Sequence, residues 1–272
     1  MQRAELGNEI DKLEKLQNMY IDTHAHLYDE RLMADEGLIP RALAAGVLKM
    51  MLPNCDSSTL QPMLDCEARW PQHCLPMMGL HPTSVKEDYL QELALVEEWL
   101  PKHKFYGVGE CGLDYYWDKT YQKEQKIAFE RQIELAIAYK LPVIIHSRES
   151  NPDCIDMVRK MQKGGLTGIF HCFSGTVDQA KAVIDLGLYL GIGGVVTYKN
   201  SLMAQVVQSA PLQMMVLETD APYLTPLPHR GKRNESSYIP LIAAKVAELK
   251  GVDISEVAKV TTANAEIIFG IR

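Results

Sequence analysis

Residues 19–26 read Met19-Tyr20-Ile21-Asp22-Thr23-His24-Ala25-His26, a short apolar run that ends in two histidines. Seven more apolar runs of four to six residues follow, at 47–52, 74–79, 105–109, 142–146, 168–171, 188–192 and 214–218. Runs of this length are typical of strands that are buried on both faces. The chain is therefore expected to contain eight such strands.

The stretches between the runs predict helices. The clearest is 126–140, where Phe129, Ile133, Ala136 and Ile137 recur at helical spacing. Further helices are expected at 177–187, 200–209, 240–250 and 253–268, the last with Asp253 as N-cap and Glu256 three residues later. Eight strands alternating with helices over about 250 residues predict an α/β fold, the (β/α)8 TIM barrel. An open doubly wound sheet is the main rival.

No linker, charge block or internal repeat divides the chain, so residues 19–272 are interpreted as a single domain. Apolar residues at rough helical spacing in 4–17 predict an N-terminal helical extension, residues 1–18, to which no role is assigned. No heptad pattern or large apolar face is present, which favours a monomer.

Composition excludes several classes of protein. With 28 Lys and Arg against 35 Asp and Glu, the 272-residue chain carries a formal net charge of −7, which argues against a protein coated with basic charge for bulk nucleic-acid binding. No apolar stretch is long enough to predict a membrane-spanning helix, and the first 18 residues do not resemble a signal peptide. Six cysteines without a C-x-x-C pair favour reduced thiols and a cytoplasmic location.

Residues with metal-ligand chemistry gather where the apolar runs end. They are His24 and His26 after the first run, Glu110 after the fourth, His146 and His171 ending the fifth and sixth, and Asp220 after the eighth. His24 and His26 are two residues apart, so an extended segment points both to one face. The C-terminal ends of barrel strands converge on one mouth, where active sites lie. Four histidines with two carboxylates there predict a binuclear site for Zn²⁺, Mg²⁺ or Mn²⁺.

Simpler interpretations exist for each part of this pattern. A single histidine at a strand end ordinarily has a structural role, and a His-x-His pair alone is weak evidence for a metal; only the combination of six residues predicts the site. The segment Gly107-Val108-Gly109-Glu110-Cys111-Gly112 matches a dinucleotide-binding spacing. It leads into Leu113-Asp114-Tyr115-Tyr116, a poor helix start, and its Glu110 would repel a pyrophosphate, so that interpretation is rejected.

The chain resembles the TatD family of metal-dependent deoxyribonucleases, within the wider amidohydrolase-like barrels. The resemblance rests on the ordered segments 22–26, 79–82, 109–115, 146–148, 171–175, 218–224 and 230–235, and on 262–270. It implies that His24, His26, Glu110 and Asp220 surround one divalent ion, that Glu110, His146 and His171 surround a second, and that Glu110 bridges the two. Two departures, Cys111 and Ser236-Ser237, lie outside the ligand positions.

The same resemblance implies a hydrolase that cuts phosphodiester bonds of DNA with a 3′-to-5′ exonuclease action and a role in DNA repair or degradation. Stacking of bases on the aromatic side chains at 115–117 would favour single-stranded DNA. Glu110 and Asp220 are the catalytic candidates, and Asp220 is also the residue expected to accept or orient the proton of the attacking water. Two divalent ions against two carboxylates predict a net local charge of about +2. Glu218 is expected to orient a histidine.

Four residues are candidate substrate contacts: His81, Arg148, Tyr115 and Arg230. Arg148 follows His146 by two residues and can face the same mouth to grip a phosphate. Arg230 opens the basic segment 230–233, which is otherwise a solvated loop. Tyr115, Tyr116 and Trp117 can stack on bases, each worth about 1–3 kcal/mol, or pack in the wall. His81 either contacts phosphate or has a structural loop role.

Two other functions stay open from the residues. One is a small-molecule hydrolase of the same barrel type, acting on an amide, lactone or phosphoester. The other is a non-catalytic binding protein with structural metals, which the absence of cysteine ligands and the presence of carboxylates disfavour.

Overall fold

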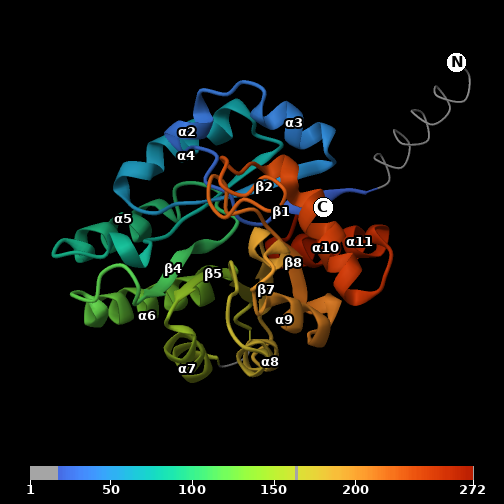
Figure 1. Ribbon diagram of the computed structural model, residues 1–272. Helices are drawn as coiled ribbons and strands as arrows, with labels where there is room; N and C mark the ends of the chain where they lie inside the picture. The colour runs from blue at the N-terminus through green and yellow to red at the C-terminus, as the bar shows by residue number, and fades with distance from the viewer. Residues whose placement is uncertain (1–17, 163–164, 272) are drawn as a thin grey trace, which may run out of the picture.

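The computed structural model describes residues 18–162 and 165–271, and in these residues eight parallel strands alternate with helices. The strands are β1 (Tyr20–Asp22), β2 (Val47–Pro53), β3 (Cys74–Met77), β4 (Val108–Asp114), β5 (Val143–Arg148), β6 (Gly168–Phe170), β7 (Tyr189–Ile192) and β8 (Met215–Leu217). Figure 1 shows the helices arranged around the strands in chain order. All eight predicted strands are confirmed.

The helices lie outside the strands. They are α2 (Glu30–Met33), α3 (Leu38–Ala44), α4 (Ser57–Arg69), α5 (Tyr89–Trp99), α6 (Gln122–Tyr139), α7 (Asn151–Met161), α8 (Val177–Asp185), α9 (Met203–Ser209), α10 (Ile239–Lys250) and α11 (Ile254–Phe269), with short 3₁₀ turns η1 (Pro82–Ser84), η2 (Gly194–Thr197), η3 (Leu212–Met214) and η4 (Ser236–Tyr238). The five helices predicted from residue 126 onward are present with small shifts at their ends. Asp253 caps α11 as predicted, accepting a hydrogen bond from Ser255 N at 2.8 Å.

Backbone hydrogen bonds join the strands into a ring. The strands form two parallel sheets, β1-β2-β3 and β4-β5-β6-β7-β8. At one seam Gly109 N donates to Met78 O at 2.9 Å, and at the other Thr23 N donates to Leu217 O at 3.0 Å. This is the (β/α)8 barrel predicted from the alternation of strands and helices, and the open sheet is excluded.

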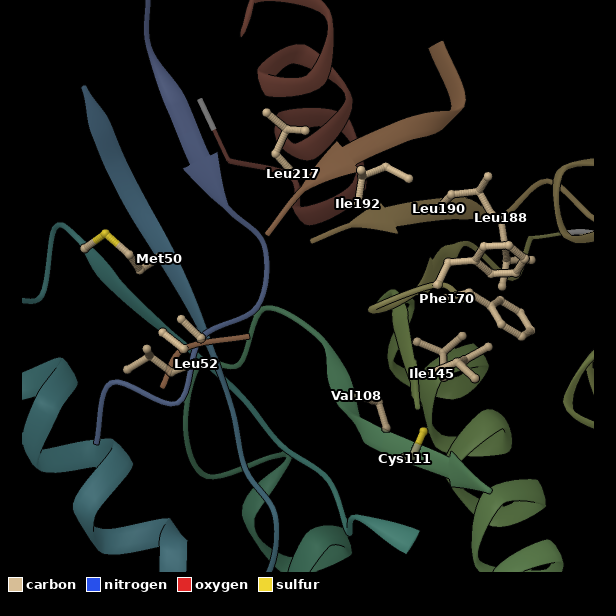
Figure 2. Packing of buried hydrophobic residues seen from close by; sticks show 14 of the residues in the cluster. Met50, Leu52, Val108, Cys111, Ile145, Phe170, Leu188, Leu190, Ile192 and Leu217 are labelled. Carbon is tan, nitrogen blue, oxygen red and sulfur yellow. The ribbon is translucent and has the colours of Figure 1, made fainter. Parts of the chain in front are cut away.

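Side chains alternate between two apolar layers along each strand. On β5, Val143 and Ile145 pack outward toward the helices, and Ile144 points into the barrel. Figure 2 shows Ile145, Phe170 and Leu190 close together in the outer layer. The inner cluster contains Ile21, Met51, Leu75, Met77, Ile144, Ile169 and Val216, together with Ala265, Ile268, Phe269 and Ile271 from α11 and the residues after it. An apolar floor thus fills the lower barrel, leaving the polar residues of the same strands at the mouth.

Strand β4 differs from its prediction. The apolar run at 105–109 predicted a strand that ends before Glu110, but β4 spans Val108–Asp114 and pairs with β5 as far as Asp114 and Arg148. Polar residues normally indicate a loop, yet here Glu110 and Asp114 are buried in the mouth of the barrel. The strand therefore continues because its polar side chains have partners inside the protein.

The predicted extension, residues 1–18, lies almost entirely outside the described residues, which begin at Asn18. Its helical character and the boundary at residue 19 therefore stay predictions. Within the described parts of the chain, no helix has the length and apolar character needed to cross a membrane.

A buried carboxylate ties the ends of β1 and β8 together. Asp22 Oδ2 accepts a hydrogen bond from Thr219 Oγ1 at 2.5 Å, and Asp22 Oδ1 accepts from Thr219 N at 2.9 Å. Both residues are fully buried. This pair sits at the seam between the two sheets. Asp22 is two residues before His24, and Thr219 is one residue before Asp220.

Replacement of Thr219 by valine tests this seam. Thr219→Val keeps the shape of the side chain but leaves Asp22 Oδ2 and the backbone N–H of Ala221, which also bonds Thr219 Oγ1 at 3.2 Å, without that partner. We expect the free energy of unfolding to fall by about 1–3 kcal/mol in urea denaturation. Thr262→Val, which removes a surface hydroxyl bonded to Met19 O, should change it by less than about 0.5 kcal/mol. Equal losses in the two variants would contradict a special role for the seam.

Candidate metal centre

Side chains alternate between the two faces of each strand, and this alternation brings the predicted ligands together at the mouth of the barrel. His146 lies two residues after Ile144, and His171 two residues after Ile169, so each histidine continues the inward face of its strand. Glu110 lies within β4, while His24, His26 and Asp220 follow the ends of β1 and β8. All six side chains meet at the mouth, as the sequence predicted.

Glu110 stands between two groups of histidines. Its Oε2 lies 3.1 Å from His24 Nε2 and 3.5 Å from His26 Nε2. Its Oε1 lies 2.7 Å from His171 Nε2 and 2.9 Å from His146 Nδ1. Each oxygen of one carboxylate therefore faces a different group.

Asp220 completes the group on the Oε2 side. Its Oδ1 lies 3.8 Å from His24 Nε2 and 3.6 Å from His26 Nε2. The residue adopts a φ of +57°, a left-handed conformation that Asp tolerates better than most residues, and its N–H donates to His24 O at 2.9 Å. The backbone thereby links Asp220 directly to the histidine pair.

His81 joins the group on the Oε1 side. Its Nε2 lies 3.3 Å from Glu110 Oε1 and 3.3 Å from His146 Nδ1. Its Nδ1 accepts a hydrogen bond from Thr83 N at 3.1 Å, where His81 caps the turn η1. Because Nδ1 accepts, the neutral ring carries its hydrogen on Nε2. His81 therefore points a donor, rather than a lone pair, into the mouth.

Two further carboxylates belong to the centre, and the sequence reasoning gave Asp114 no role. Asp114 Oδ2 lies 2.9 Å from His146 Nε2, and its Oδ1 accepts from Tyr116 N and Trp117 N at 2.9 and 3.0 Å. Glu218 Oε1 lies 3.6 Å from His171 Nδ1, which places it beside a histidine as expected. The spacing between Glu110 and Asp114, four residues apart on one inward strand face, was the available signal for Asp114.

Glu110 and Asp114 stay ionised at the centre. Burial alone would raise the pKa of Glu110, but His171, His81, His24 and His146 hold it well below its usual range. Burial likewise opposes ionisation of Asp114, yet the hydrogen bond from His146 and the two backbone donors lower its pKa to about 2. Burial would lower the pKa of His171, while Glu110 and Glu218 raise it well above its usual value. The centre therefore attracts positive charge, whether protons or cations.

The donor set suits divalent cations. Three groups of side chains bring candidate ligand atoms within 4.8 Å of one another: His24 with His171 and Asp220, His24 with His26 and Glu110, and His81 with Glu110 and His146. In the third group the lone pairs come from Glu110 and His146, because His81 Nε2 carries a hydrogen. Among the described residues, the buried Nδ1 atoms of His24 and His171 have no hydrogen-bond partner. Imidazole and carboxylate ligands suit Zn²⁺ and Mn²⁺, and carboxylates also suit Mg²⁺.

The charge balance differs from its prediction. The net local charge of about +2 counted only Glu110 and Asp220 against two divalent ions. Asp114 and Glu218 add two carboxylates in contact with the histidines, so two divalent ions would be matched by four negative charges. The attraction of an anionic substrate then depends on cationic side chains at the mouth.

A cavity of about 810 Å³ opens over the centre. Its lining includes Arg148 and Trp117, together with Tyr28, Cys55 and Tyr223. The Arg148 guanidinium carbon lies 3.9 Å from the centre of the Tyr116 ring and 5.3 Å from that of Trp117. Arg148 is thus placed at the mouth, as its spacing from His146 predicted.

Tyr115 and Arg230 are not brought to the cavity. The Tyr115 hydroxyl donates to Asp153 at 2.7 Å, and its ring packs against the outer core, so Tyr115 is absent from the cavity lining and its role as a substrate contact stays a prediction. Its neighbour Trp117 lines the cavity instead because the chain turns after β4. Arg230 lies over Tyr198, 4.4 Å from the ring centre, and Arg233 is paired with Asp35 at 2.6 Å. The basic segment is therefore largely engaged within the protein.

The departures noted in the sequence leave the centre intact. Cys111 is buried in the outer core, with its thiol 3.7 Å from Ile144 O. Ser236 begins the turn η4, and Ser237 Oγ donates to Glu235.

A (β/α)8 barrel whose strand ends gather histidines and carboxylates in an open cavity is typical of metal-dependent hydrolases. The model of one family, TatD related DNase, matches residues 21–270. The chain belongs to the TatD family of metal-dependent hydrolases.

Relatives and solved structures agree with this assignment. The chain is 37% identical over 256 residues to YabD of Bacillus subtilis, named an uncharacterized metal-dependent hydrolase, with 93% of this chain and 100% of that one covered. It is 32% identical over 249 residues to the 3′-5′ ssDNA/RNA exonuclease TatD of Salmonella typhimurium, covering 87% and 93% of the two chains. The crystal structure of YjjV, a TatD homologue from Escherichia coli K12, superposes with a TM-score of 0.85 at 29% identity, covering 93% and 98%.

Replacement of Glu110 tests whether the centre holds cations. Glu110→Gln removes the charge that faces both histidine groups, so we expect the purified protein to lose most of its bound Zn²⁺, measured by mass spectrometry of the metal after loading and desalting. The buried carboxylate Glu235, which accepts from Arg41 Nε at 2.9 Å away from the centre, provides the control. Glu235→Gln should keep the wild-type metal content. Unchanged metal in the folded Glu110 variant would contradict the central position of this carboxylate.

Proposed function

We propose that the protein is a metal-dependent deoxyribonuclease that removes nucleotides from the 3′ ends of single-stranded DNA at a binuclear centre. The observation that carries the proposal is the position of Glu110, whose Oε2 faces His24 and His26 and whose Oε1 faces His146 and His171. A carboxylate placed in this way can bridge two cations.

The residues divide into two ligand groups in this proposal. His24, His26 and Asp220 would share one ion with Glu110, and His146 and His171 would share the other. When bound, two divalent ions (Zn²⁺, Mg²⁺ or Mn²⁺) supply an activated water and stabilise charge on the phosphoryl oxygens. Asp114 holds His146 with Nδ1 toward the centre, because Nε2 donates to the Asp114 carboxylate.

Asp220 is the proposed proton acceptor. Burial raises the pKa of this carboxyl, but hydrogen bonding to His26 and the nearby charges of His171 and His24 lower it below its usual value. The group is therefore ionised at neutral pH and able to hold the proton of an attacking water at Oδ1.

Two side chains at the mouth suit a phosphate. His81 presents an Nε2–H donor beside Glu110, as its hydrogen bond from Thr83 N requires. Arg148 lines the cavity, and among the described residues of the lining it is the one arginine or lysine. With the carboxylates matched by the ions, Arg148 supplies the positive charge that a phosphodiester needs.

The choice of substrate is supported by two observations. Trp117 lines the cavity and is 67% exposed, so its ring is available to stack on a base. The Salmonella relative is named a 3′-5′ exonuclease of single-stranded DNA and RNA. The cytoplasmic location, the monomeric state and a role in DNA repair, all expected from the sequence, remain parts of this proposal.

Degradation of labelled oligonucleotides tests the activity. Metal-stripped protein should leave a single-stranded DNA oligomer intact, and adding Mg²⁺, Mn²⁺ or Zn²⁺ should restore stepwise shortening from the 3′ end. A 5′ label would then appear on a ladder of shortening products, whereas a 3′ label would be released as mononucleotide at once. RNA of the same sequence in parallel reports on the sugar preference.

The same assay distinguishes the nuclease from the small-molecule hydrolase. Folded, metal-loaded protein that leaves DNA and RNA intact, but hydrolyses simple amide, lactone or phosphoester substrates, would replace the nuclease by the small-molecule hydrolase. Cleavage that proceeds from the 5′ end would contradict the proposed polarity but agree with the proposed nuclease activity.

Replacement of Arg148 tests the phosphate contact. Arg148→Gln removes the cation that lines the cavity, and we expect KM for single-stranded DNA to rise about 10-fold, with a weaker dependence on salt. Arg230→Gln should leave KM near its wild-type value because Arg230 lies over Tyr198, away from the cavity lining. A larger effect at Arg230 than at Arg148 would reverse the assignment of the two arginines.

A further inference from the structure

Tyr28 contacts the far side of a ligand histidine. Its hydroxyl oxygen lies 2.9 Å from His26 Nδ1, on the opposite side of the ring from Glu110. The same hydroxyl donates to the backbone carbonyl of Pro53, at the end of β2. Tyr28 is buried, and its ring meets that of His26 edge-on at 5.7 Å between centres.

The direction of these hydrogen bonds follows from chemistry. A carbonyl oxygen only accepts, so the hydroxyl hydrogen of Tyr28 is committed to Pro53. Toward His26 the phenol oxygen can then only accept, and His26 Nδ1 must carry the hydrogen between them. The thiol of Cys55 is a weaker competitor, since its sulfur lies 3.8 Å from the same nitrogen.

This hydrogen bond determines which His26 nitrogen faces the centre with a free lone pair. With the hydrogen held on Nδ1, that nitrogen is Nε2, which lies 3.5 Å from Glu110 Oε2 and 3.6 Å from Asp220 Oδ1. His81 has the opposite arrangement, because Thr83 N donates to its Nδ1. The two histidines thus differ in their partners and in what they offer to the cavity.

We propose that Tyr28 is a positioning residue for the metal centre, one that fixes the tautomer and ring orientation of His26 through the chain His26 Nδ1–H to Tyr28 to Pro53 O. The role is commonly filled by a carboxylate or a backbone carbonyl acting directly on the histidine. Here the phenol lies between the ring and the backbone carbonyl of Pro53. The inference rests on the proposed function, in which His26 is a ligand.

Titration of metal-stripped protein with Co²⁺ tests this role. Followed by the visible absorption of the bound ion, wild-type protein should take up two equivalents. In Tyr28→Phe, one of the two sites should weaken by about 10- to 100-fold, and the other should keep its affinity. Tyr198→Phe is the matched control, since it also loses a hydroxyl that donates to a backbone carbonyl, Thr225 O at 2.9 Å. That variant should bind both ions as the wild type does.

A second measurement keeps the test independent of how the variant folds. In the Zn²⁺-loaded wild-type protein, long-range ¹H–¹⁵N spectra should show the His26 hydrogen on Nδ1. A hydrogen on Nε2 would overturn the proposal without any substitution. Equal weakening of both Co²⁺ sites in Tyr28→Phe, together with a lower unfolding midpoint of the metal-free protein, would also overturn it by showing a general structural role.

The remaining outcomes separate this inference from the function on which it rests. Wild-type affinity at both sites in Tyr28→Phe refutes the positioning role and leaves the metal centre standing. One weakened site in Cys55→Ala, with none in Tyr28→Phe, assigns the contact to the thiol and likewise refutes it. Failure of the wild-type protein to bind Co²⁺ refutes the binuclear centre itself, and the inference with it.

Discussion

The Glu110 carboxylate is the interaction on which the rest of the site depends. It is buried in the ring of strands, and its two oxygens face histidines that come from opposite sides of the barrel. Five buried or half-buried histidines packed together would be unfavourable without a negative charge among them. The ionised carboxylate makes this packing possible, and the same charge makes the position attractive to divalent cations. One residue therefore links the stability of the mouth to its chemistry.

The histidines around Glu110 are distinguished by partners that lie behind them. Asp114 is behind His146, Glu218 is beside His171, Tyr28 is behind His26, and Thr83 N is behind His81. The hydrogen bonds of His146, His26 and His81 decide which nitrogen of each of these three rings faces the cavity with a lone pair and which with a hydrogen. A histidine can in this way act as a metal ligand at one position, and another histidine can act as a hydrogen-bond donor to substrate.

The parts of the site that could be predicted follow the strand periodicity. His146 and His171 are the next inward positions after Ile144 and Ile169, so their convergence required only an alternating pattern and a closed ring. Where periodicity ends, the sequence no longer indicates which side chains line the cavity. Tyr115 and Trp117 are both aromatic and two residues apart, yet only Trp117 lines the cavity, because the turn after β4 directs Tyr115 toward Asp153. Arg230 lies over Tyr198 and not in the cavity lining, because its position depends on the path of a loop that no local sequence pattern specifies.

The sequence by itself determined the eight strands, the order of the helices, the closure into a barrel and the six side chains that meet at its mouth. These properties depend on hydrophobic periodicity and on the geometry of parallel strands, both of which are local or follow from the fold class. The tertiary structure alone decided the continuation of β4 to Asp114, the charge balance at the mouth and the roles of Asp114 and Tyr28. Each of these depends on which distant group lies at hydrogen-bond distance, and only the packing of separate segments brings such partners together.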